Sequence, residues 1–263
     1  MQFALVKGER VSAAPDIEGI CPGCSQPVTS KCGEQRIWHW AHLTKRTCDD
    51  WWEPETEWHR AWKSHFPTEC QEDIKYDDES GEKHIADVRT QHDLVIEFQY
   101  SHLNPQERAA RERFYGNMVW VVNGTRLKRD YPRFLKEKDR LRPAPKQGFF
   151  LLEWPEDCFP AMWLDSAVPV LFDFRDIAQP DSPDGFREPL WCLLPGRAER
   201  SAVVAAISRK SFVETASSQP QLLAAHELVS FFGQLIRQQR MAEETAVITR
   251  LRSYQQPLRR RRF

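Results

Sequence analysis

The sequence has no long apolar run and no secretory leader. Crossing a bilayer takes roughly 18 consecutive apolar residues, and the most apolar stretch near the middle of the chain, residues 161–174, is interrupted by Asp165 and Asp173. The opening segment MQFALVKGERV has no basic part followed by a long apolar part, so we expect no signal peptide. These absences predict a cytoplasmic protein with no membrane partner.

An excess of one charge sign is also missing. The chain carries 37 Lys and Arg residues against 38 Asp and Glu residues, a formal net charge of −1. It therefore has no global attraction to nucleic acid, and a DNA-binding surface would have to be a local basic one. The four arginines at 259–262 are one candidate, with a solvated chain end as the alternative.

The seven cysteines are an odd number for a disulfide framework, and two of them form the CxxC pair at 21–24. This pair lies close to the sequence HWAH at 39–42, which in a reducing compartment favours a bound metal over a disulfide. Zinc takes four tetrahedral ligands, and two short chelating pairs on turns supply them at little entropic cost. We predict a closed, structural Zn²⁺ site here, with ordinary cysteines and structural histidines as the alternative. Its expected ligands are Cys21, Cys24, His42 and, as the fourth, His39 or Cys48, which spacing does not separate, with Cys32 a weaker candidate.

Residue patterns in the middle of the chain predict a mixed sheet. Helical periodicity covers residues 53–66 and 106–115, and strand patterns cover residues 84–89, 94–100 and 118–122. The short polar segment between the first two strands makes them a hairpin. The order helix, hairpin, helix, strand predicts an α/β (α+β) fold with a mixed sheet flanked by helices.

Three regions follow from these patterns. Residues 1–50 combine an N-terminal strand pair with the Cys/His segment, and residues 51–145 hold the core just described. Residues 146–263 are expected to contain short strands, a polar loop and one or two amphipathic helices over residues 221–252. A protein partner or a homo-oligomer, where one forms, is expected to use these C-terminal helices.

The predicted hairpin carries two acids. Asp87 lies in its first strand and Glu97 in its second, and Gln99 follows on the same face as Glu97. Glu97 stands inside the apolar run Leu94–Phe98, where a carboxylate needs a partner because burying a lone charge is costly. Two carboxylates on a hairpin form a site for a hard divalent ion such as Mg²⁺, which binds a phosphate oxygen and lowers the pKa of a bound water. Solvated strand acids are the alternative.

The helix before the hairpin adds further candidates. Glu55, His59 and Lys63 are spaced four apart and therefore line one face of it. If this face looks into the acidic site, Glu55 adds a carboxylate, and Lys63 or His59 contacts a phosphate. Glu57 is the runner-up for Glu55, and an ordinary helix surface is the alternative interpretation.

Taken in order, these motifs resemble those of the competence protein CoiA-like nucleases, a branch of the PD-(D/E)XK superfamily. The likeness covers about the first 125 residues and is loose beyond about residue 146. The matching segments are CPGC at 21–24, HWAH at 39–42, ETEWHRAWK at 55–63, HIADV at 84–88, IEFQYS at 96–101, RERFY at 111–115 and VWVVNG at 119–124.

The resemblance implies a restriction-endonuclease-like core in which Asp87 and Glu97 bind a catalytic Mg²⁺ or Mn²⁺. Gln99 then stands where many relatives carry the lysine of the ExK motif. Glutamine can act neither as a cation nor as a base, so we assign Gln99 to orienting the attacking water or a phosphate oxygen. The residues that match the motif after it, and that we expect to support the site and bind substrate, are Ser101, Arg111 and Tyr115.

We therefore expect a Mg²⁺- or Mn²⁺-dependent deoxyribonuclease that acts in DNA uptake and recombination or in antiviral defence against foreign DNA. The alternative is a DNA-binding adaptor of recombination or transformation with a weak or idle nuclease site, although the intact Asp87 and Glu97 argue against full decay. Sequence patterns do not separate single-stranded from double-stranded DNA as the substrate.

Overall fold

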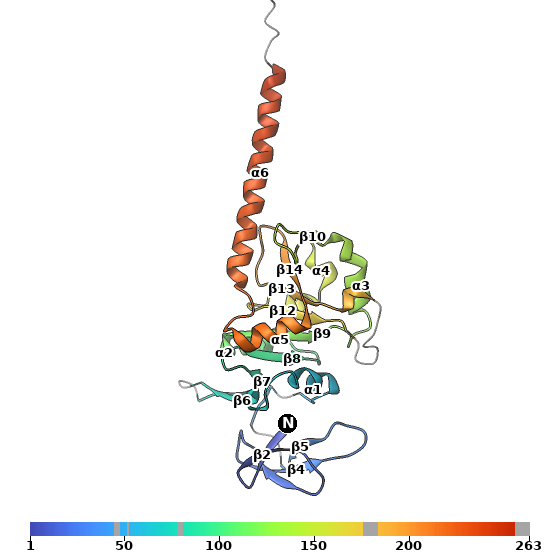
Figure 1. Ribbon diagram of the computed structural model, residues 1–263, viewed down its shortest axis with the longest axis vertical. Helices are drawn as coiled ribbons and strands as arrows, with labels where there is room; N and C mark the ends of the chain where they lie inside the picture. Colours follow the sequence, from blue (N-terminus) through green and yellow to red (C-terminus); the bar gives the residue numbers. More distant parts are fainter. Residues whose placement is uncertain (45–47, 52, 78–80, 176–183, 256–263) are drawn as a thin grey trace, which may run out of the picture.

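The computed structural model describes residues 1–44, 48–51, 53–77, 81–175 and 184–255. These form a small N-terminal sheet, a large mixed sheet with helices packed on it, and one long helix that projects from the body (Figure 1). The arginines at 259–262 lie outside the described residues.

The small sheet has five antiparallel strands in the order β2-β1-β3-β4-β5. The expected strand pair over residues 2–13 is its first hairpin. Ala4, Val28 and Trp40 fill its core. The strands are β1 (Phe3–Val6), β2 (Glu9–Ser12), β3 (Glu18–Ile20), β4 (Pro27–Lys31) and β5 (His39–His42).

The large sheet has nine strands in the order β10-β11-β14-β13-β12-β9-β8-β7-β6. Strands β8, β9 and β12 run parallel to one another and all other pairs are antiparallel, so the predicted mixed sheet is confirmed. The strands are β6 (Gln71–Tyr76), β7 (Lys83–Arg89), β8 (Val95–Gln99), β9 (Met118–Asn123), β10 (Arg142–Pro143), β11 (Phe149–Leu152), β12 (Val170–Asp173), β13 (Leu190–Leu193) and β14 (Ala202–Ile207).

Helices cover both faces of this sheet, and strand alternation decides which residues meet them. Phe98 and Val121 pack with α1, α5 and the start of α6 on one face, whereas Val95 and Trp120 pack with α2, α3 and α4 on the other. Strand β8, which lies between β9 and β7, is therefore buried on both sides. The helices are α1 (Glu57–Lys63), α2 (Pro105–Tyr115), α3 (Asp130–Glu137), α4 (Pro155–Cys158), α5 (Arg209–Ser218) and α6 (Ala225–Gln255).

Two expectations about boundaries differ from the structure. The first helix begins at Glu57, because Thr56 caps it, so Glu55 lies in the segment before the helix rather than on its face. The large sheet also runs across residue 145, since β11 to β14 continue the sheet that β6 to β9 begin. The strands before and after residue 145 join in one sheet because β12 pairs in parallel with β9.

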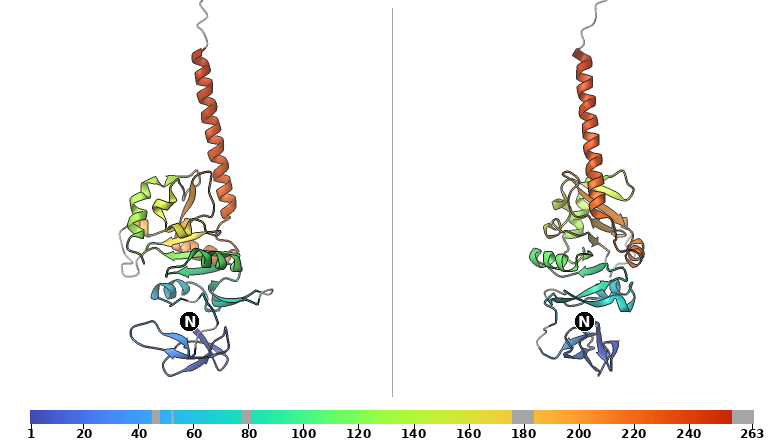
Figure 2. Two further views of the ribbon diagram at one scale, coloured as in Figure 1. Left: turned by 180° about the vertical axis from the view of Figure 1, so that it is seen from behind. Right: turned by 90° about the vertical axis from the view of Figure 1, so that its left-hand side faces the viewer.

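Helix α6 leaves the body soon after it begins (Figures 1 and 2). Phe232 packs into the core, but residues 237–251 are all exposed. Within the described ranges no helix combines the length and the apolarity that a membrane crossing needs.

Candidate functional site

The Cys/His segment folds into a compact cluster of Cys21, Cys24, His42 and Cys48, whose ligand atoms all lie within 4.8 Å of one another. The sulfur atoms of Cys21 and Cys48 are 3.9 Å apart, and His42 Nε2 is 3.2 Å from Cys24 Sγ and 3.6 Å from Cys48 Sγ. Zinc–sulfur bonds of about 2.3 Å in a tetrahedron place ligand atoms about 3.8 Å apart. This set therefore fits a structural metal such as zinc.

His39 lies outside the cluster, which corrects the expectation that it supplies a ligand. His39 and His42 both lie in β5, and residues three apart in a strand point to opposite faces. The His39 ring instead contacts the carbonyl oxygen of Ile37, 2.9 Å from Nδ1. Cys48 completes the cluster, and Cys32 also stays outside it.

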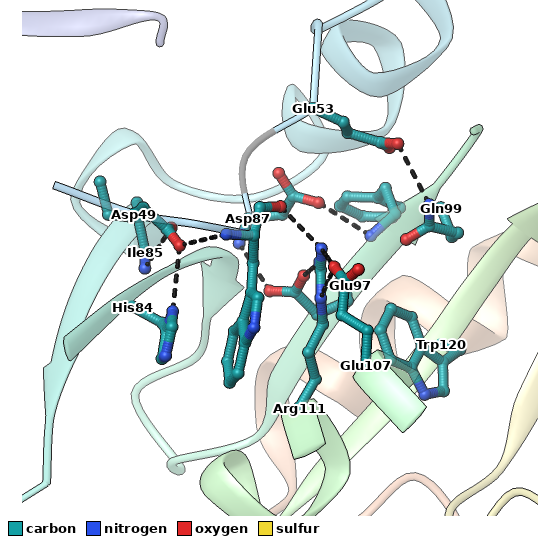
Figure 3. A network of polar contacts seen from close by, with 12 residues as sticks. Asp49, Glu53, His84, Ile85, Asp87, Glu97, Gln99, Glu107, Arg111 and Trp120 are labelled. Carbon is teal, nitrogen blue, oxygen red and sulfur yellow. Dashed lines mark hydrogen bonds and ion pairs between the residues drawn. The ribbon is translucent and has the colours of Figure 1, made fainter. Parts of the chain in front are cut away.

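Three carboxylates stand in a row across adjacent strands of the large sheet. In the register of β6 with β7, Glu72 falls opposite Asp87. In the register of β7 with β8, Asp87 falls opposite Glu97. We call these three residues the acid row; the structure thus brings Asp87 and Glu97 together on the hairpin (Figure 3).

The backbone opens at the acid row. The N–H of Asp87 donates to Glu97 Oε1 at 3.2 Å, and the N–H of Phe98 donates to Asp87 Oδ2 at 2.9 Å, so carboxylates stand where strand-to-strand hydrogen bonds would form. Glu72 has a φ of 48°, a conformation that costs an L residue on the order of 1–3 kcal/mol. The Glu72 carboxylate is held in this conformation by Lys63 and by the backbone N–H groups of Gln2 and Phe3, which donate to it.

Helix α1 places a buried lysine over the acid row. Lys63 is only 2% exposed, and its Nζ lies 2.5 Å from Glu55 Oε1 and 3.2 Å from Glu72 Oε1. Burial alone would lower the pKa of Lys63, but the carboxylates of Glu72 and Glu55 outweigh it and raise the pKa. Lys63 therefore stays positively charged beside Asp87.

Glu53, rather than the acid row, receives the side chain of Gln99. Its carboxylate lies 2.8 Å from His59 Nε2 and accepts hydrogen bonds from Gln99 Nε2 at 3.1 Å and from the backbone N–H groups of Tyr100 and Ser101, each at 3.2 Å (Figure 3). The Ser101 hydroxyl also donates to it. Gln99 and Ser101 thus both hold Glu53 in place, and their expected roles in orienting water and binding substrate stay predictions.

Helix α2 supplies the other two residues that were expected to bind substrate. Arg111 is buried, with one guanidinium nitrogen 3.2 Å from Glu97 Oε2 and another donating to the carbonyl oxygen of Trp51 and to Glu107. Tyr115 is 3% exposed. Both line the same cavity as the acid row, so any contact with a substrate would be made inside that cavity.

Two acids of the site have raised pKa values. Burial, reinforced by the nearby Asp87, raises the pKa of Glu97 to about 8, although Arg111 opposes the shift. Burial also raises the pKa of Asp87, although Lys63 opposes it. Asp87 and Glu97 therefore release their protons less readily than free carboxyl groups do.

The other acids around the cavity have lowered pKa values. Burial alone would raise each pKa, but a basic partner outweighs it. The pairs are Asp49 with His84, Glu53 with His59, and Glu55 and Glu72 with Lys63, which lowers the pKa of Glu72 to about 2.

These residues enclose a cavity of about 70 Å³. Six carboxylates line it, against Lys63, Arg111 and His59 as basic groups. Pockets that hold drug-sized ligands typically measure about 300–1,000 Å³, so this cavity suits a cation with bound water rather than a nucleotide. Carboxylate oxygens are the ligands that hard divalent cations prefer.

Three of the cavity acids were not among the sequence candidates: Asp49, Glu53 and Glu72. Asp49 directly follows the metal-cluster residue Cys48, which was a usable signal. Glu72 lies in β6, a strand without a clear apolar alternation. Glu53 precedes the helix, where spacing along a helix cannot place it.

The comparisons with known proteins concern the N-terminal segment. Residues 18–50 match the family model described as the N-terminal domain of competence protein CoiA. This stretch contains β3 to β5 and the whole metal cluster. No curated protein and no solved structure matched the chain. The resemblance is thus confirmed over residues 18–50, the PD-(D/E)XK assignment stays a prediction, and through this N-terminal segment the chain is CoiA-like.

Proposed function

We propose that this protein is a metal-dependent nuclease that hydrolyses phosphodiester bonds in DNA. The observation that carries the proposal is the acid row, in which Asp87 and Glu97 face each other in an enclosed acidic cavity under the charged Lys63. A purely structural pair of buried acids would be expected to have matched cations. Here Glu97 shares Arg111 with Glu107, and Asp87 forms no ion pair within 4 Å among the described residues.

A divalent cation fits the donors present. Asp87 and Glu97 would hold Mg²⁺ or Mn²⁺, since both offer carboxylate oxygens and both have pKa values raised by burial. When bound, such an ion neutralises charge on a phosphate and lowers the pKa of a coordinated water.

The remaining side chains of the cavity have roles that need no ion. Lys63 is the positive group next to Asp87 and would bind a phosphate oxygen, taking the part that the ExK lysine has in many relatives. Gln99 and His59 both fix Glu53. Since the cavity of about 70 Å³ is too small for a nucleotide, the DNA strand would lie along its mouth.

The fold and the family match support the proposal from two sides. A hairpin with Asp87 and Glu97, followed by α2 and the parallel strand β9, is the order expected of a restriction-endonuclease-like core. The match to the CoiA N-terminal domain supports a competence-related role, in which DNA is taken up and recombined.

The test is a cleavage assay on circular single-stranded and linear duplex DNA, without added divalent ions, with Mg²⁺ and with Mn²⁺. Zinc-loaded protein is used throughout, because EDTA would also strip the Cys/His cluster. Asp87→Ala and Glu97→Ala should each lower the cleavage rate by about 1000-fold or more, because both water activation and charge neutralisation are lost. The exposed Glu57, changed to Ala, is the matched control and should cleave like the parent.

If the two acid variants cut as fast as the parent, the nuclease proposal fails. DNA binding without cleavage by the parent would then favour the adaptor function.

A further inference from the structure

A short strap joins the metal cluster to the wall of the acidic cavity. Cys48 is a member of the cluster, and its chain neighbour Asp49 lines the cavity. We define the strap as residues 48–51. Because no flexible linker separates the two sites, a displacement of Cys48 moves Asp49 with it.

Asp49 ties the strap to strand β7. Its two carboxylate oxygens accept from the backbone N–H of Ile85 at 3.0 Å and lie 3.0 Å from His84 Nδ1 (Figure 3). It also accepts from the N–H of Trp51 at 2.9 Å. The carboxylate oxygens of Asp49 are thus occupied by contacts within the protein, one of them with Ile85, two residues before Asp87. We therefore interpret Asp49 as a residue that fixes β7 rather than as a further cation ligand.

Trp51 carries the strap across to Glu97. Its ring stacks on the His84 ring, with centroids 3.1 Å apart and an angle of 8°. Its carbonyl oxygen accepts from Arg111 at 2.6 Å, and its ring lies 5.4 Å from the same guanidinium. Arg111 in turn reaches Glu97 Oε2 at 3.2 Å. A continuous series of contacts therefore runs from the cluster to the acid row.

A second contact joins the metal cluster to strand β7. Lys83, the first residue of β7, donates through Nζ to the carbonyl oxygen of Gly23, which lies between Cys21 and Cys24. The cluster is therefore anchored at both its CxxC turn and its Cys48 end to the strand that carries Asp87.

We propose that the strap makes the metal cluster a positioning device for the acid row, with Asp49 and Trp51 as positioning residues. Divalent-ion binding at Asp87 and Glu97 then depends on Asp49 and on an intact cluster. This inference rests on the proposed nuclease function, and it adds that the N-terminal metal site governs the geometry of the cavity instead of merely stabilising its own sheet.

The test compares Asp49→Asn with Asp50→Asn, the same change at the exposed neighbour. Mn²⁺ binding to zinc-loaded protein is measured by calorimetry and by electron paramagnetic resonance. Asp49→Asn should retain its zinc but bind Mn²⁺ about 10-fold more weakly, the lower end of the loss known for outer partners of metal ligands, because Asp49 reaches Asp87 through Ile85 and Glu97 through Trp51 and Arg111. Asp50→Asn should match the parent.

A second pair of variants addresses the cluster itself. Cys48→Ser should lose zinc and Mn²⁺ binding together, whereas Cys32→Ser, outside the cluster, should lose neither. Hydrogen exchange gives a readout without Mn²⁺: the Ile85 amide, which donates to Asp49, should exchange at least tenfold faster in both Asp49→Asn and Cys48→Ser.

The outcomes separate the two proposals. Parent-like Mn²⁺ affinity in Asp49→Asn would overturn the strap inference and leave the nuclease proposal standing. A parent that binds no Mn²⁺ would count against the nuclease, and the exchange data would then decide the strap: faster Ile85 exchange supports it, and unchanged exchange in both variants overturns it.

Discussion

Replacing Glu97 by Gln tests whether the acid row holds a proton at neutral pH. Burial and the neighbouring Asp87 raise the pKa of Glu97 from an ordinary 4.5 to about 8. The folded protein then keeps a proton that the unfolded chain has released. The stability from this proton is complete below about pH 4.5 and is lost as the pH rises through about 8. One pKa unit corresponds to about 1.4 kcal/mol, so the loss amounts to at most about 5 kcal/mol.

The measurement is urea unfolding, followed by tryptophan fluorescence, at pH values from about 5 to 8.5. The buffer contains one equivalent of zinc and no Mg²⁺ or Mn²⁺, so that the Cys/His cluster stays loaded while the acid row stays free. The free energy of unfolding of the parent should fall by several kcal/mol relative to Glu97→Gln as the pH rises. Glu57→Gln, an exposed change on α1, should follow the parent. Adding Mn²⁺ near pH 8 should restore the parent and leave Glu97→Gln unchanged.

A difference between parent and Glu97→Gln that stays constant across this pH range would refute the reasoning. It would mean that Glu97 is already ionised, with Arg111 as a sufficient partner. Mn²⁺ would then bind without displacing a proton, and its effect on the stability of the parent should not vary with pH over this range.

Four further changes test other parts of the protein. Cys24→Ser should lower the zinc content from one per chain to none in elemental analysis, while Cys32→Ser keeps it. Asp173→Ala should lower the free energy of unfolding by about 3–5 kcal/mol in urea titrations. It removes the carboxylate that accepts from the buried indole N–H groups of Trp58 and Trp62 and pairs with the guanidinium of Arg209. Gln99→Lys should keep a near-parental melting temperature because Glu53 would pair with the new charge, and aggregation of this variant would contradict that placement. Deleting residues 259–262 should reduce the salt dependence of DNA binding by up to about one unit of slope per lost phosphate contact.

The parts of the site that the sequence predicts well are local ones. Strand alternation and a short polar turn place Asp87 and Glu97 in one hairpin, and the structure has that hairpin as β7 and β8. Pro105 likewise predicts the start of helix α2, and the apolar run that ends at Asn123-Gly124 predicts strand β9. In each case the signal and the element lie within about ten residues of each other.

The parts that sequence patterns miss depend on contacts across the fold. Taking HWAH as a turn brings His39 and His42 to one side, but pairing with β4 makes the segment a strand and turns His39 away. Glu72 joins the acid row only because β6 pairs with β7. Gln99 lies on the same face of β8 as Glu97, as the alternation of side chains along a strand predicts. Its side-chain amide nevertheless donates to Glu53, which precedes α1 and could not be placed from the sequence.

The pattern of partners around the cavity bears on where the proposed cation would bind. Four of the six acids that line it have a basic partner which lowers their pKa, and α1 or β7 supplies that partner. Only Asp87 and Glu97 have raised pKa values, so they are the two acids whose charge the surrounding basic groups balance least. Glu97 shares Arg111 with Glu107, and Asp87 forms no ion pair within 4 Å among the described residues. Under the proposed nuclease function, a divalent ion that enters the cavity would therefore gain most beside these two carboxylates, and the surrounding ion pairs would direct it there instead of offering it six equivalent sites.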